Sequence, residues 1–130
     1  MAHIKKFSFI FLIIMIFSSC NRATERNCTK FYAGKYFSET IIDGVQYKST
    51  FRRDTSGLQI EEFKGIIDSS KVRWINNCEM VLSTINPKNN IDKKNILIKI
   101  LETTDTSYTY EYSYLGEAKK VKASAFKIEN

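Results

Sequence analysis

The chain has 130 residues, of which 43% are hydrophobic, and carries a net charge of +6 from 20 Lys and Arg against 14 Asp and Glu. The basic residues are scattered between acids along every segment, so they do not form the patch that nucleic-acid binding requires. The only histidine, His3, lies near the start; without it the chain has no imidazole for Ser-His-Asp catalysis or the usual zinc sites.

Residues 1–19 have the organisation of an export signal. Lys5 and Lys6 form a positive n-region, residues 9–17 are an unbroken apolar run, and two serines follow,. The apolar run is about half of the roughly 20 residues that a transmembrane helix needs. We therefore expect a cleaved signal peptide, whose removal leaves 18 basic against 14 acidic residues, a net charge of +4.

The next residue gives this signal a specific meaning. Phe17-Ser18-Ser19-Cys20 resembles the lipobox of bacterial lipoproteins, with Phe17 in place of the more usual leucine. The resemblance implies that Cys20 is the lipid attachment site, carrying diacylglycerol and an acyl chain such as palmitate, each buried CH₂ contributing about 0.8 kcal/mol to membrane binding. The expected location is the cell envelope, with the outer membrane as the anchor and the domain facing the periplasm or the surface. A plain signal peptide with an incidental cysteine is the alternative.

Two cysteines remain after Cys20, namely Cys28 and Cys78. Exported proteins occupy compartments in which disulfides persist, and lipidation accounts for the odd cysteine. A Cys28–Cys78 disulfide is therefore expected, closing a loop of about 50 residues that the chain-entropy model values at roughly 4 kcal/mol. Two free buried thiols are the alternative. Residues 20–33, which are mainly polar until Phe31, are interpreted as a lipidated tether, and residues 34–130 as one β domain.

From residue 34 onward the apolar pattern has period two, which is typical of strands with one buried face. Asp43-Gly44 is a strong hairpin signal because a type I′ turn needs two positive φ values. Asp54-Thr55-Ser56, Asp68-Ser69-Ser70 and Asp105-Thr106-Ser107 are expected to be turns, since such side chains bond the backbone just ahead of them. The predicted strands are 34–42, 45–53, 58–63, 72–75, 78–85, 96–103, 107–115 and 121–128.

This pattern predicts an all-β fold of about eight short antiparallel strands in an up-and-down meander. Such a meander protects its edges by curling into a small barrel or half-barrel, similar to a lipocalin. Residues 28–37 (CTKFYAGKYF), 72–79 (VRWINNCE) and 107–112 (SYTYEY) resemble a family of small lipoproteins from Bacteroidetes such as flavobacteria. Members are sometimes labelled DNA topoisomerase IV. A secreted chain of this length is too short for that activity and lies in the wrong compartment for it. The resemblance implies no activity.

Four alternating tyrosines are the most unusual feature: Tyr108, Tyr110, Tyr112 and Tyr114. With Trp74 they form a possible binding surface, on which sugars stack or a partner protein binds. The alternative is that the tyrosines fill the barrel and that Trp74 packs against the disulfide.

Enzymatic chemistry has little support in the sequence. Glu61 and Glu62 are adjacent and point to opposite faces of a strand. Glu61 could meet Glu79 or Glu111 across strands, as a glycosidase-like site requires; the alternative is that these acids are solvated and paired with Arg52, Arg53 or Arg73. We expect no catalytic residues, no metal and no cofactor.

These observations favour a non-enzymatic envelope module that is anchored to the membrane and binds a protein or glycan partner. That hypothesis predicts an exposed aromatic and basic patch and no interior cavity. The alternative is a carrier of a small apolar ligand inside a lipocalin-like barrel. An eight-stranded barrel is just wide enough for its own side chains or one small ligand, so a filled interior would exclude the carrier.

Overall fold

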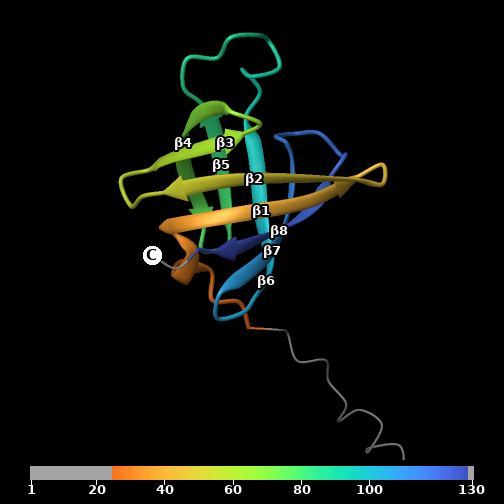
Figure 1. Cartoon of the computed structure of the whole chain (residues 1–130). Helices are drawn as coiled ribbons and strands as arrows, with labels where there is room; N and C mark the ends of the chain where they lie inside the picture. Colours follow the sequence, from red (N-terminus) through yellow and green to blue (C-terminus); the bar gives the residue numbers. More distant parts are fainter. Residues whose placement is uncertain (1–24, 129–130) are drawn as a thin grey trace, which may run out of the picture.

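A computed structural model describes residues 25–128 (Figure 1). It contains one short 3₁₀ helix, η1 (Cys28–Phe31), followed by eight β-strands. The strands are β1 (Gly34–Ile42), β2 (Val45–Arg53), β3 (Leu58–Phe63), β4 (Ile66–Asn76), β5 (Glu79–Thr84), β6 (Ile96–Thr103), β7 (Ser107–Tyr114) and β8 (Val121–Lys127).

The strands form a closed barrel in which each pairs with the next and β8 pairs with β1, all antiparallel. The predicted fold class, an all-β up-and-down meander, is therefore confirmed, and the barrel is complete rather than half-closed. Closure satisfies every strand edge, which an open sheet of this length would leave unpaired.

Alternation along each strand decides which side chains enter the barrel. On β6, Ile98 and Ile100 are buried inside, while the intervening Lys99 faces outward. On β2, Phe51 and Arg53 are buried, whereas Arg52 between them is exposed. The period-two pattern thus assigns the faces of these strands correctly. The inward-facing residues are not all apolar, however, since they include Arg53.

Two tight turns set the register of the first four strands. Asp43 and Gly44 have φ values of 51° and 78°, as the predicted type I′ turn requires,. Lys64 and Gly65 have φ values of 50° and 78° and make a second two-residue turn. Because this second turn is so short, β4 begins at once, at Ile66.

That early start corrects one predicted turn. Asp68-Ser69-Ser70 lies in the middle of β4, where Asp68 pairs with Glu61 and Ser70 with Gln59. The short Lys64-Gly65 turn places these polar residues opposite β3, and pairing overrides their local turn preference. Asp54 does make its predicted turn, accepting bonds from the N–H groups of Ser56 and Leu58.

The third predicted turn, after β6, forms around a different residue. The Thr104 hydroxyl, rather than Asp105, accepts the N–H groups of Thr106 and Ser107. Asp105 instead lies at the surface, where it pairs with Lys30.

The two ends of the barrel differ. The closed end carries the β2–β3, β4–β5 and β6–β7 turns and is covered by η1, whose Phe31 has no exposed surface. The opposite end, here called the mouth, carries the other four connections, residues 43–44, 64–65, 85–95 and 115–120 (Figure 1).

The helix η1 at the closed end is part of the core: Phe31 packs on Tyr108 with ring centroids 5.0 Å apart and lies 6.3 Å from Tyr36. The expected domain boundary at residue 34 leaves out this helix, although its burial makes it part of the core.

Candidate functional site

The barrel interior contains a cavity of about 330 Å³. It extends from Arg53 and Gln59 near the closed end to Ile42, Phe63 and Ile96 beside the mouth. The volume lies at the lower end of the range of small-molecule sites, which are concave and mostly apolar with a few placed polar groups. This cavity is the candidate functional site.

Small side chains explain why the interior is not full. Ser38 on β1 pairs with Ala125 on β8 and with Ser49 on β2. These three inward-facing neighbours form one row across adjacent strands, so that side of the barrel leaves open space. Tyr110 reaches toward the row, and its hydroxyl lies 2.6 Å from the Ser38 hydroxyl.

The tyrosine stripe is mostly inside the barrel. Tyr108 and Tyr110 are buried, Tyr112 is half-buried, and all three line the cavity. Tyr114 is 37% exposed, with the Lys94 ammonium 5.1 Å from its ring centroid. Burial raises the pKa of Tyr110, and the hydrogen bond with Ser38 opposes that rise in part. These three tyrosines are therefore interior walls, placed as the filling alternative expected, and they do not form an exposed surface.

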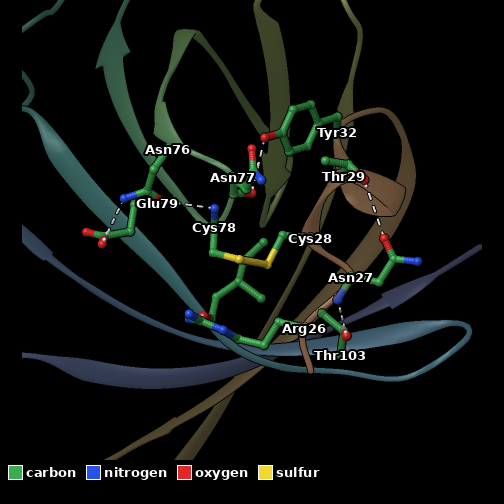
Figure 2. Close-up of a disulfide and its surroundings, with 11 residues drawn as sticks. Arg26, Asn27, Cys28, Thr29, Tyr32, Asn76, Asn77, Cys78, Glu79 and Thr103 are labelled. Carbon is green, nitrogen blue, oxygen red and sulfur yellow. Dashed lines mark hydrogen bonds between the residues drawn. A yellow bond between two sulfur atoms is a disulfide. The ribbon is translucent and has the colours of Figure 1, made fainter. Parts of the chain in front are cut away.

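The disulfide joins η1 to the β4–β5 turn (Figure 2). Cys28 is fully buried, and the Cys78 N–H donates to the Asn76 side-chain oxygen at 2.9 Å. Tyr32 lies beside this bond and donates to the Asn77 carbonyl at 3.1 Å. Trp74 is half-buried and stacks on Tyr32 with ring centroids 3.9 Å apart. The expected Cys28–Cys78 bond is thus present, and Trp74 contributes to packing at the closed end.

Further contacts hold the segment before η1 in place. The Arg26 guanidinium donates to the Ile100 carbonyl at 2.9 Å, and the Asn27 N–H donates to the Thr103 hydroxyl at 2.9 Å. This segment therefore follows the barrel wall before the chain enters η1 (Figure 2).

Arg53 is the residue whose role the sequence did not indicate. It was expected among solvated charges, yet it is only 4% exposed and lines the cavity floor. Its Nε donates to Gln59 Oε1 at 2.9 Å and its Nη1 to the Phe31 carbonyl at 2.8 Å. The period-two pattern could have located it, because Arg53 lies on the same face of the strand as Phe51. Its position next to a turn, however, is one where an arginine is usually a surface charge.

Glu61 is the acidic residue of the cavity wall. Burial raises its pKa, and the negative charge of Asp68 on β4 raises it further. The two carboxylates that could have joined it do not line the cavity: Glu79 accepts a hydrogen bond from Asn76, and Glu111 pairs with Lys120. The structure therefore does not assemble the carboxylate pair that a glycosidase-like site requires.

Within residues 25–128, no group of three or more His, Cys, Asp or Glu side chains could hold a metal ion. The same part of the chain contains no helix long and apolar enough to cross a bilayer. Cys20 and the proposed signal peptide lie outside the described residues. No protein-family model, curated protein or solved structure matches the chain.

Proposed function

We propose that this protein is a membrane-anchored binding module of the cell envelope that carries a small, mainly apolar ligand inside its barrel. The cavity of about 330 Å³ is the observation that supports this function. Its walls include Phe51, Leu82 and Ile98, side chains whose exposed surface a ligand would remove from water at about 25 cal/mol per Å²,.

The placement of the aromatic residues favours a carrier over a module that binds a protein or glycan at its surface. The surface hypothesis needs the tyrosine stripe outside and a filled interior. Tyr108, Tyr110 and Tyr112 instead face the cavity, and only Tyr114 of the four is exposed. A carrier function accounts both for the inward-facing tyrosines, which are walls of the ligand site, and for the unfilled interior.

Anchoring through Cys20 would fix the orientation of the carrier. Arg26 and Asn27 are held against the barrel wall near the closed end, so six residues lead from Cys20 to the held part of the chain and span at most about 22 Å. Cys28 is held at the closed end by the disulfide. The closed end would therefore lie near the membrane, and the mouth would point away from it toward the aqueous compartment.

Ligand binding is tested with the small neutral fluorophore 1-aminonaphthalene, whose emission shifts to shorter wavelength in apolar surroundings. We expect saturable binding of one fluorophore per barrel. Ser49→Phe places a large ring among the small residues of the wall and should weaken this binding at least tenfold. Thr50→Phe is the matched control, because Thr50 is exposed on the outer face of the same strand.

Two results would reject the carrier. One is the absence of saturable binding by a folded protein; the other is equal binding by the two phenylalanine variants. Equal binding would mean that the fluorophore adheres to the outer surface.

Anchoring is tested separately by labelling cells with radioactive palmitate. The wild type should take up label and fractionate with the outer membrane, whereas Cys20→Ser should do neither. Label in the Cys20→Ser protein would contradict the lipid attachment site.

A further inference from the structure

The Arg53 guanidinium is a buried charge surrounded by neutral groups. Besides its bonds to Gln59 and the Phe31 carbonyl, its Nη2 lies 3.4 Å from the Tyr108 hydroxyl. The Phe51 ring centroid lies 5.2 Å from its central carbon, and the Trp74 ring centroid 5.8 Å. All of these partners are uncharged.

Across residues 25–128, no carboxylate lies within 4.0 Å of this cation. Taking a full charge out of water is costly unless an opposite charge and hydrogen bonds replace the lost hydration. The aromatic rings supply only part of that replacement. Arg53 therefore lies in a site that has hydrogen-bond acceptors and no counter-ion.

The guanidinium also keeps donor capacity. It has five N–H groups in a planar fork. Three are directed at the acceptors named above, and the bond to Tyr108 is long at 3.4 Å. Two N–H groups are left, in a side chain that lines the cavity floor. A carboxylate is the group whose two oxygens match such a fork, through short charge-assisted hydrogen bonds.

From this arrangement we infer that the cavity binds an amphipathic monoanion, with its carboxylate at Arg53 and its alkyl chain directed toward the mouth. The inference rests on the proposed carrier function and specifies its ligand class. Phe51, Leu82 and Ile98 line the path of the alkyl chain. At about 30 Å³ for each water-sized group, 330 Å³ holds about a dozen non-hydrogen atoms, the size of a medium-chain carboxylate such as decanoate,.

Other charges near the cavity are consistent with this polarity. Glu61 lines the wall on the mouth side of Gln59, and burial disfavours its ionised form. Lys48 also lines the cavity, and its ammonium is paired with Glu39 at 3.3 Å. Arg53 is thus the cation that lacks a carboxylate partner on the cavity wall.

The test is competition against bound 1-aminonaphthalene at pH 8 by decanoate, decanol and decylammonium, which share an alkyl chain and differ in head group. The wild type should prefer decanoate. Arg53→Met should weaken decanoate about 10- to 100-fold, the usual range for hydrogen bonds to a charged group, while decanol changes little. Arg52→Met is the matched control, because it removes the same charge from the exposed outer face and should leave all three affinities unchanged.

Equal competition by decanoate and decanol on the wild type would overturn the inference, and that comparison needs no variant. The same holds if Arg53→Met and Arg52→Met weaken decanoate equally, since the effect would then be that of overall charge. Fluorophore binding without a head-group preference would leave the carrier function standing, whereas no fluorophore binding would reject the carrier itself. The two failures are therefore distinguishable.

Discussion

Replacing both cysteines of the Cys28–Cys78 bond, as Cys28→Ser with Cys78→Ser, should lower the free energy of unfolding by about 4 kcal/mol. The bonded residues are 50 positions apart. In the chain-entropy model a loop of that length restricts the unfolded ensemble by this amount at 25 °C. Small domains have a net stability of about 5–15 kcal/mol, so the loss is a large share of it.

The effect should arise mainly in the unfolded state. In the native state η1 remains held by the burial of Phe31 and by the hydrogen bond that its carbonyl accepts from Arg53. The serine variant should therefore keep the native far-UV circular dichroism spectrum. Its unfolded chain is less restricted and exposes more surface, so the dependence of stability on urea, the m-value, should rise.

Trp74 provides the assay. It is the only tryptophan, and it stacks on Tyr32 beside the disulfide, so its fluorescence should change when the closed end unfolds. Urea titrations of the wild type, the serine variant and the wild type with reductant give the comparison. Reductant should shift the wild-type midpoint to that of the serine variant and leave the variant unchanged. A loss below about 1 kcal/mol, or an altered native spectrum, would refute the entropic explanation.

Three further changes can be measured by the same titration. Phe31→Ala should cost about 3–5 kcal/mol, because it removes a fully buried ring from the closed end,; a loss under 1 kcal/mol would show that η1 is dispensable. Burial raises the pKa of Glu61, so the folded state binds that proton more tightly than the unfolded state. Its ionisation therefore removes stability as the pH rises from the ordinary glutamate value through the raised one. Glu61→Gln should increase stability at pH 7 and flatten the pH profile in that window; an unchanged profile would contradict the shift. Gly44→Ala should lower the free energy of unfolding by about 1 kcal/mol, because alanine is disfavoured at a positive φ,. Gly34→Ala should lower it further, because φ is positive there too and the new Cβ would in addition lie 3.2 Å from the Tyr36 hydroxyl. The reverse order would exclude crowding as the cause.

Much of the fold could be predicted because the relevant interactions are local. Period two marks the strands, and Asp43-Gly44 requires one kind of turn. The start of β4 could not be predicted in the same way. Asp68, Ser69 and Ser70 favour a turn in isolation, and only the neighbouring Lys64-Gly65 turn, which starts β4 at Ile66, places them opposite β3. Strand pairing is non-local, so a local preference gives the wrong answer there.

The site was harder to predict than the fold because its buried cation, Arg53, lies at the end of a strand. Arg53 is the last residue of β2 and is followed by the Asp54 turn, a position where arginines are usually solvated. Its burial results from η1, which covers the closed end and offers the Phe31 carbonyl as an acceptor. That contact joins two elements of different type across 22 positions, and no periodic pattern encodes it.

The interior cavity shows why composition misleads about a barrel. Seven tyrosines and nine phenylalanines suggest a filled interior, but four of the phenylalanines lie in the first nineteen residues. Phe37 and Phe126 face each other on paired strands and stack with ring centroids 4.9 Å apart. They alternate with inward-facing residues, so they lie on the outer face of the barrel and do not fill its interior. On the inner face of the same strands and of β2, the small residues Ala125, Ser38 and Ser49 are neighbours only in the paired register. Each of the three is an ordinary small residue in its own strand, and it is their alignment across three strands that leaves room for a ligand. Substitutions in this row should therefore set the length of ligand that the barrel accepts, whereas Arg53 should set its charge.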